Sequence, residues 1–187
     1  MQGETAQFRI AFDHALELEG GFSNHPHDAG GKTIYGVASA SWPTWYTHIM
    51  EAYTRGDKAE ALARARRFYF EEIWRARPFD RIQHAGLRVT AFDLHVNHTF
   101  RTGGLIIQRA CNCLIHGLRY EPLEEDGWMG PKSVTRINAL AGRYEESVIG
   151  AIAGERWRHY RAVIAARPEN ASFARGWAKR VLPPRLQ

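Results

Sequence analysis

Apolar side chains recur at helical spacing over residues 4–19, the first segment with a clear pattern. Phe8, Phe12 and Ala15 fall on one stripe of such a helix, and Glu19 lies on the same stripe. Two glycines follow directly, and glycine is typical of the residue just past a helix end. We therefore expect a helix that ends at Glu19, with this carboxylate facing the core, where a charge is costly unless it has a purpose.

A loop with a little β-structure is expected next. The helical period disappears between Phe22 and Val37, where Asn, Pro, Asp and Gly are frequent. This composition predicts a small hairpin that turns at 29–31. The β-branched and aromatic residues of 33–37 predict the one convincing strand of the chain.

Helices are predicted for almost everything that follows. Spacing and end signals place them at 43–54, 57–74, 85–98, after Gly103-Gly104 as far as Leu118, from Pro131 onward, from 143 to about 168, and at 172–181. The expected fold class is therefore mainly α, with one small β-hairpin.

Length and composition fit a globular protein. The 187 residues are 44% hydrophobic and 24% charged, which excludes a disordered chain. No apolar run approaches the roughly 18 residues of a membrane-spanning helix, so we expect no stable membrane insertion. The first residues lack the basic and apolar regions of a signal peptide, which predicts synthesis in the cytoplasm.

The net charge of the chain narrows the possible classes of partner only slightly. The excess of 25 Lys and Arg over 20 Asp and Glu gives a net charge of +5, which favours a polyanion. Nucleic acid, anionic lipid and anionic cell wall all qualify, but no helix-turn-helix or basic stripe supports nucleic acid.

Cys111 and Cys113 lie two positions apart in a predicted helix and so point to different faces, which disfavours a disulfide between them.

The segment from Glu19 to Val37 carries the candidate chemistry. It places a carboxyl group at a helix end, a second one nine residues later at Asp28, and a hydroxyl group five beyond that at Thr33. Glycosidic cleavage needs an acid for the leaving oxygen and a second group that stabilises the oxocarbenium ion or activates water. Burial raises the pKa of a Glu, whereas an Asp on a glycine-rich loop stays ionised. The alternative is structural: Glu19 pairs with an arginine, and Asp28 is an ordinary turn residue.

This segment resembles the N-terminal signature of the glycoside hydrolase family 108 muramidases, a lysozyme-like family found among phage endolysins and secreted bacterial enzymes. The family pattern is E-G-G-[YF]-S-x-D-P-x-D-P-G-G-x-T-x-x-G-[IV]. The matching positions are Glu19, Gly20, Gly21, Phe22, Ser23, Pro26, Asp28, Gly30, Gly31, Thr33, Gly36 and Val37. His25 stands where the family has its first aspartate, and Ala29 replaces a proline. The resemblance assigns catalysis to Glu19, and similarity to phage lysozymes gives Asp28 and Thr33 supporting roles.

Three later segments extend the resemblance over about residues 8–181. The run 92–97 is similar to the family helix that carries Asp and Asn around the cleft, here Asp93 and Asn97. The runs 126–132 and 173–181 resemble the turn and the ending of an associated peptidoglycan-binding region. The implied organisation is a lysozyme-like catalytic region at 1–100 and a helical peptidoglycan-binding region at 101–187, packed as one unit.

The resemblance implies an N-acetylmuramidase that cleaves the β-1,4 bond between N-acetylmuramic acid and N-acetylglucosamine, as in a bacteriolytic endolysin. It would need no cofactor, act as a monomer, and reach the wall through a holin or another route, with the basic surface drawn to the anionic envelope. The alternatives are a lytic transglycosylase that cuts the same bond, and a wall-binding module without activity.

Substrate contacts are assigned to four residues. Tyr35 and Trp42, near the hairpin, are the candidates for stacking on sugar rings. Asn97 is a candidate for the N-acetyl group, with Asp93 on the same helix. No metal is expected. Glycosidases of the type that the resemblance implies need none, and the His25/His27 pair lies in a loop where exposed histidines are usually only polar. No further Cys or His ligands at the spacing of a zinc site join His95 and His98.

Overall fold

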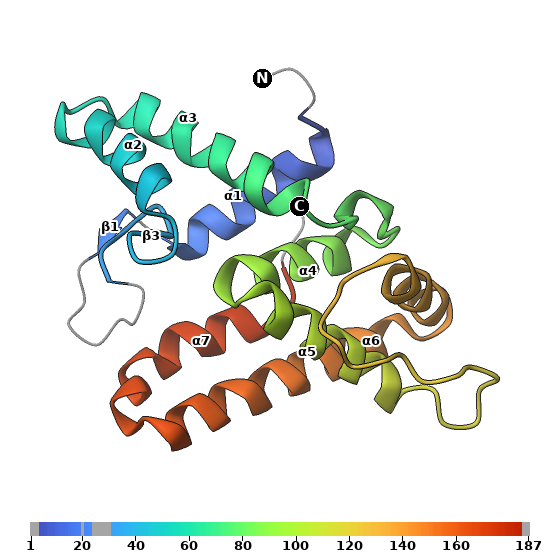
Figure 1. The fold of residues 1–187 in the computed structure, drawn as a ribbon. Helices are drawn as coiled ribbons and strands as arrows, with labels where there is room; N and C mark the ends of the chain where they lie inside the picture. The colour runs from blue at the N-terminus through green and yellow to red at the C-terminus, as the bar shows by residue number, and fades with distance from the viewer. Residues whose placement is uncertain (1–3, 20, 24–30, 185–187) are drawn as a thin grey trace. The chain divides into compact units, whose positions relative to one another are not determined.

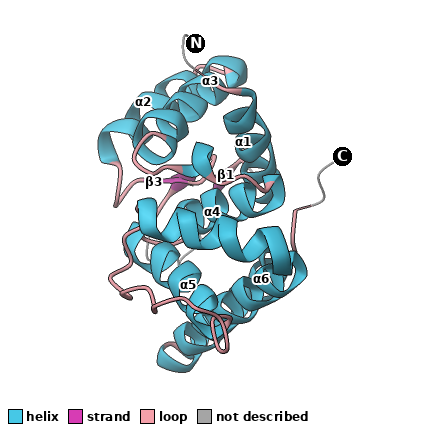
Figure 2. Ribbon diagram, turned by 90° about the vertical axis from the view of Figure 1, so that its right-hand side faces the viewer, coloured by secondary structure: helices cyan, strands magenta, loops and turns pink. Residues whose placement is uncertain are grey.

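The computed structural model describes residues 4–19, 21–23 and 31–184 of the chain; the side chain of Glu19 also lies outside the description. The chain divides into two compact units, Met1–Ala76 and Arg77–Gln187. Helices dominate both, and the strands form one small patch in the first unit (Figures 1 and 2). The fold is therefore mainly α with a small antiparallel sheet, as the sequence predicts.

The first helix, α1 (Ala6–Glu19), ends where the glycines predict. It begins after Thr5, whose hydroxyl accepts a hydrogen bond from the Phe8 N–H at 3.2 Å and so caps the helix start. The expected apolar stripe is buried, with Phe8 and Phe12 at most 2% exposed. Burial of this stripe fixes the rotation of the helix that ends in Glu19.

The sheet is made of three two-residue strands, β1 (Phe22–Ser23), β2 (Thr33–Ile34) and β3 (Val37–Ala38), in the order β1-β2-β3. The prediction of a single strand at 33–37 is wrong, because Tyr35 and Gly36 form a tight turn between β2 and β3. Both have positive φ, 49° and 78°, as a two-residue hairpin turn of the primed type requires. Of the hairpin turn expected at 29–31, only Gly31 lies within the described residues.

Two helices and a π-helical segment complete the first unit. They are α2 (Pro43–Thr54), α3 (Lys58–Phe68) and η1 (Tyr69–Trp74), and α2 packs against α3. The Asp57 side chain accepts a hydrogen bond from the Glu60 N–H at 3.0 Å, which caps the start of α3. The helix predicted over 57–74 is continuous, but its last six residues have π-helical geometry.

The second unit consists of η2 (Phe79–Arg81), α4 (Ala85–Asn97), α5 (Phe100–Cys113), α6 (Pro131–Ala166), η3 (Pro168–Phe173) and α7 (Ala174–Val181). The two helices predicted from Pro131 and from 143 form one long element with a kink at Tyr144 (φ −137°, ψ 46°). The predicted end of the preceding helix at Leu118 is too late, since α5 stops at Cys113. Cys111 is buried and Cys113 is exposed, and both are free, in line with their expected opposite faces.

Gly103 and Gly104 lie inside α5, whereas the sequence suggested that they precede it. The reason is close packing. A Cβ atom on Gly104 would clash with the carbonyl oxygen of Gly127, which itself has a φ of 76°. These glycines therefore permit the backbone of the segment after α5 to lie directly on the helix.

Candidate active site

The candidate acid lies at the junction between α1 and the sheet. Glu19 is the last residue of α1, and β1 begins three positions later at Phe22. The carboxylate of Glu19 and the whole of Asp28 lie outside the described residues. The described part of the site is thus the frame around this junction: the sheet, the tip of its hairpin and the helices that hold them.

Thr33 is positioned by the register of the sheet. It pairs with Ser23 of β1 and with Ala38 of β3. Directly opposed residues project to the same side of a sheet, so Thr33 and Ser23 present their hydroxyl groups together. Ile34 and Val37 are fully buried, which makes the face with Thr33 the outer one. The sheet therefore places a half-buried threonine opposite the strand that follows Glu19.

Tyr69 joins the hairpin tip to the helix of Glu19. Its hydroxyl donates a hydrogen bond to the Tyr35 carbonyl at 2.8 Å, and its ring centroid lies 5.6 Å from that of Phe12 on α1. The Tyr35 N–H also donates to the Gly21 carbonyl, just after α1. The sequence does not single out Tyr69, since an aromatic residue in a helix carries no signal of what its hydroxyl binds.

The aromatic residues beside the sheet form a partly exposed surface. Phe22 is 43% exposed, and its ring stacks with that of Tyr53 at 6.5 Å. Tyr35 meets the same Tyr53 edge to face at 6.2 Å. Burial, and to a smaller degree Tyr53, raises the pKa of Tyr35, so its hydroxyl stays neutral. Phe22 and Tyr53 were not among the residues predicted to bind sugar.

Trp42, the other predicted stacking residue, has a different environment. It precedes α2, and its half-buried ring meets Phe68 of α3 edge to face at 5.0 Å. Within the described part of the chain, no ring contact joins Trp42 to Tyr35. The structure thus puts Tyr35 on the aromatic surface and Trp42 in the packing between α2 and α3.

Family models match the chain in two consecutive blocks. Residues 12–99 match the model for glycosyl hydrolase 108, and residues 102–182 match a predicted peptidoglycan domain. The chain contains a glycoside hydrolase family 108 domain. It is accordingly a glycoside hydrolase that acts on peptidoglycan, and the first block contains the whole Glu19 junction and the sheet.

A solved structure supports the fold of the whole chain. The structure of Brucella abortus SagA aligns with a TM-score of 0.63 and 23% sequence identity, covering 93% of this chain and 88% of that one. No curated protein matches the chain. At this level of identity the likeness shows the fold alone.

The family blocks and the compact units divide the chain differently. The models change over between residues 99 and 102, whereas the units divide between Ala76 and Arg77. Helix α4 therefore belongs to the family 108 match and packs within the second unit. The functional division at residues 100 and 101 stays a prediction.

Asp93 of α4 was expected to bind substrate, and its placement favours a structural role instead. It is 1% exposed, and each carboxylate oxygen lies 2.7 Å from a guanidinium nitrogen, one from Arg156 and one from Arg180. Asn97 accepts a hydrogen bond from the Tyr160 hydroxyl at 2.6 Å. Asp93 thus links α4 to α6 and α7, and binding of an N-acetyl group by Asn97 stays a prediction.

His95 of α4 is buried, and His98, the residue directly after this helix, is partly buried. Burial lowers the pKa of His95 to about 4, and the Nδ1 atom of this residue lies 2.8 Å from the Ala91 carbonyl oxygen. Burial and the nearby Arg156 guanidinium lower the pKa of His98 to about 2. Within the described residues no group of three or more His, Cys, Asp or Glu could hold a metal. His25 and His27 lie outside them, so the expectation of no metal stays a prediction.

No helix in the described part of the chain is long and apolar enough to cross a membrane.

Proposed function

We propose that the protein is an N-acetylmuramidase, which hydrolyses the β-1,4 bond between N-acetylmuramic acid and N-acetylglucosamine with Glu19 as general acid. The observation that carries this proposal is the position of Glu19. It ends a helix whose buried stripe faces the core, next to a sheet that Tyr69 links to the same helix. Glu19, the sheet and Tyr69 all lie inside the block matched to family 108.

The proposed chemistry divides the work between two carboxyl groups. A Glu at the end of an apolar stripe loses hydration, which raises its pKa and keeps it protonated for the leaving oxygen. Asp28, on the glycine-rich loop, is the proposed stabilising carboxylate or water-positioning base. Thr33 orients the water or Asp28. A separation of the carboxyl groups of about 5–5.5 Å would give retention at the anomeric carbon, and one of about 6.5–9.5 Å would give inversion.

Sugar binding is proposed for the aromatic surface beside the sheet. The C–H groups on one face of a pyranose pack well on an aromatic ring, and the exposed ring of Phe22 offers such a face. Tyr35 adopts a φ of 49°, which is strained for a side chain of this size. The hydrogen bond from the Tyr69 hydroxyl offsets that cost. Because strained residues that are held in place are common at functional sites, this conformation supports a functional reason for the position of Tyr35. Trp42 stays a weaker candidate.

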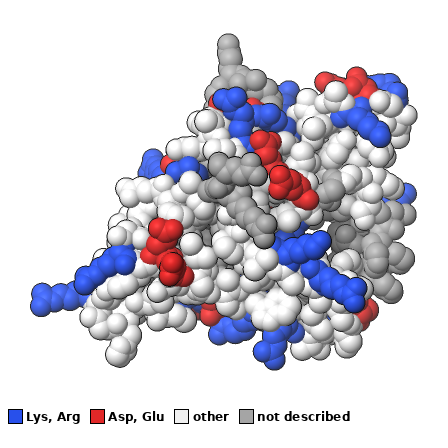
Figure 3. All heavy atoms as spheres, turned by 180° about the vertical axis from the view of Figure 1, so that it is seen from behind, with Lys and Arg blue, Asp and Glu red and all other residues white. Residues whose placement is uncertain are grey.

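The biological role follows from the substrate. We propose that cleavage of the glycan leads to lysis of bacterial cells once the enzyme reaches the wall, by way of a holin or another route. Attraction of the basic chain to the envelope is proposed as a minor aid. Lys and Arg are interspersed with Asp and Glu on the face shown in Figure 3, where no patch of a single sign dominates.

The proposal is tested by the reducing ends that the protein releases from purified peptidoglycan, with Glu19→Gln and Glu17→Gln as matched variants. Glu17 is exposed on the same helix, two residues away. Loss of a general acid typically costs about 10²–10⁴ in rate, whereas Glu17→Gln should keep wild-type activity. Activity of Glu19→Gln within about threefold of wild type would remove Glu19 from the mechanism. Anhydro-sugar ends in the mass spectrum would identify a lytic transglycosylase instead.

A further inference from the structure

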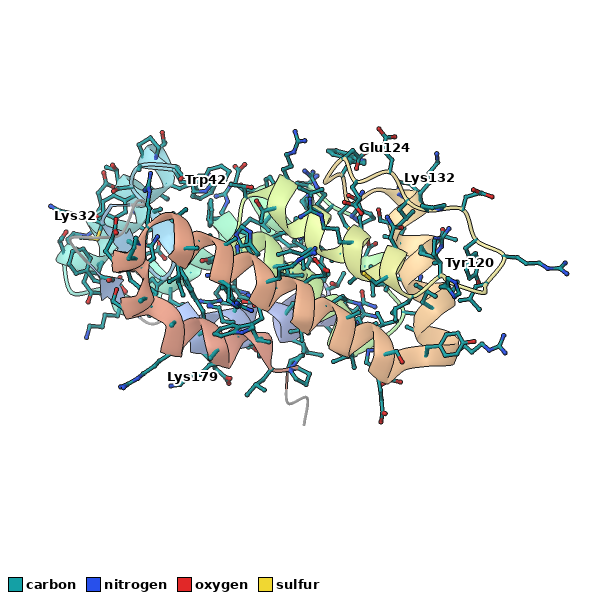
Figure 4. All side chains as sticks on the ribbon, turned by 90° about the horizontal axis from the view of Figure 1, so that it is seen from below. Lys32, Trp42, Tyr120, Glu124, Lys132 and Lys179 are labelled. Carbon is teal, nitrogen blue, oxygen red and sulfur yellow. The ribbon has the colours of Figure 1, made fainter. Side chains whose placement is uncertain are left out.

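A groove of about 880 Å³ opens in the second unit, between the segment that follows α5 and the first turns of α6. Its lining includes Tyr120, Glu124, Asp126, Trp128, Lys132 and Arg136. Figure 4 shows Tyr120, Glu124 and Lys132 at the same end of this unit. The volume is in the range of small-molecule sites. All of its lining residues lie between 108 and 139, outside the proposed catalytic residues.

Trp128 is the most unusual residue of this groove, because it is 56% exposed and yet firmly held. The backbone N–H of Trp128 donates a hydrogen bond to an Asp126 carboxylate oxygen at 2.7 Å. Its carbonyl accepts hydrogen bonds from the side chains of Gln108 at 3.1 Å and Ser133 at 3.3 Å. Its backbone is therefore fixed on both sides of the exposed ring.

The buried amide of Gln108 organises this arrangement. Gln108 is 2% exposed, donates to Asp126 at 2.7 Å and accepts from the Gly127 N–H at 2.8 Å. A buried polar group is costly unless all its hydrogen bonds are made, so such a network specifies one loop geometry. The loop that presents Trp128 is thus built with more polar contacts than a surface turn needs.

The indole ring is also held. The Arg77 guanidinium lies 4.1 Å from the ring centre, and a Cβ atom on Gly130 would come within 2.7 Å of the ring. A second exposed ring, Tyr120, is 41% exposed and has the Arg136 guanidinium 4.6 Å from its centre. Arg136 in turn donates to the Glu121 carbonyl at 2.8 Å. Two exposed aromatic rings are therefore preorganised along one groove, which lowers the entropic cost of binding a ligand.

We propose that this groove is a second carbohydrate site, which binds a glycan segment of peptidoglycan with one pyranose face on Trp128. Tyr120 supports a neighbouring sugar, and Lys132 at the rim meets carboxylates of the stem peptides that the muramic acid units carry. The choice of peptidoglycan glycan rests on the proposed function and on the match of residues 102–182 to a predicted peptidoglycan domain.

The charges of the groove favour a glycan over a polyphosphate. Carboxylates at Glu121, Glu124 and Asp126 outnumber the cations at Lys132 and Arg136. Hydrogen bonds from Gln108 and Trp128 lower the pKa of Asp126, so this carboxyl group stays ionised. A nucleic acid would meet repulsion here, whereas a sugar ring needs the apolar faces and hydrogen-bonding rim that the groove offers.

The experiment uses the full chain with Glu19→Gln, so that the glycan is not cut, and sediments it with purified peptidoglycan. Adding Trp128→Ala should weaken binding by at least about tenfold, as for an aromatic anchor at a binding centre. The matched control is Trp157→Ala, since Trp157 is 37% exposed on α6 of the same unit but outside the groove lining. Equal affinity of the Trp128 and Trp157 variants would overturn the proposal.

A second measurement reads the site itself and does not depend on a folded alanine variant. In the ¹⁵N-labelled Glu19→Gln chain, the indole N–H signal of Trp128, assigned by its loss in Trp128→Phe, should shift on addition of a soluble N-acetylglucosamine tetramer. A shift with free stem peptide but none with the sugar would overturn the glycan assignment. This outcome is independent of the muramidase proposal, because failure of Glu19 to support hydrolysis would leave the Trp128 signal unaffected.

Discussion

In Met1–Ala76 the helices meet through aromatic rings, whereas in Arg77–Gln187 three helices meet around a buried carboxylate. The first unit packs Phe8 of α1 against Phe70 and Trp74, with ring centres 5.0 and 5.5 Å apart. The second unit pairs Asp93 with Arg156 and Arg180 at 2.7 Å each. Ring packing tolerates small shifts, while an ion pair in low dielectric demands fixed geometry.

This difference predicts how each unit responds when one of its packing groups is lost. The ionic centre extends through Tyr160, whose hydroxyl accepts from Arg156 at 3.0 Å and donates to Asn97 at 2.6 Å. A buried charge that loses its partner is far more costly than a ring that shifts. We therefore expect the second unit to respond sharply to the loss of one polar group, and the first unit to respond mildly.

The largest effect is expected for Asp93→Ala, which leaves two buried guanidinium groups without their shared partner. Breaking a buried pair in this way typically costs about 3–5 kcal/mol in the free energy of unfolding. Asp80→Ala, at an exposed position of η2 in the same unit, should stay within about 0.5 kcal/mol. Urea unfolding of both variants gives the measurement. A cost below about 1 kcal/mol for Asp93→Ala would break the comparison.

The origins of these features explain what the sequence could predict. The stripe that orients α1, and Glu19 at its end, follow from local spacing, so they were predictable. The turn at Tyr35-Gly36 was missed because tyrosine is unusual at a position with positive φ, and a distant hydroxyl, that of Tyr69, holds it there. The partners of Asp93 lie far along the chain on α6 and α7, and no local sequence pattern predicts these ion pairs.

Acid should lower the free energy of unfolding of the second unit, by less than Asp93→Ala does. The pKa values of His95 and His98 fall to about 4 and about 2 in the folded state, below the ordinary 6.5. The unfolded chain therefore binds more protons as pH falls below 6.5, and stability that is fully present above this pH is lost. Between pH 6.5 and 5.5 the loss should be about 1 kcal/mol for each histidine.

Hydrogen exchange of the full chain locates this loss, which we expect in Arg77–Gln187. His95→Leu should remove about half of the acid-induced loss of exchange protection at the α4 amides. The control is His116→Ala, an exposed residue of the same unit that should leave it unchanged. An equal loss of protection in α1 would show that both units unfold together, and would limit the contrast to local chemistry.

The smallest effect is expected for Tyr69→Phe in the first unit. This variant removes the hydrogen bond to the Tyr35 carbonyl but keeps the ring that packs on Phe12, so its cost should be about 1 kcal/mol, the net value of a neutral hydrogen bond. Tyr69→Leu, which also removes the ring, should cost more and serves as the control for packing. Because the lost bond fastens the strained tip of the hairpin, release of reducing ends should fall several-fold in Tyr69→Phe, beyond what the small change in stability explains. Full activity of Tyr69→Phe with a normal melting temperature would show that the tip holds its shape without this bond. A stability loss as large as that of Asp93→Ala would instead show that the first unit depends on a polar centre just as the second does.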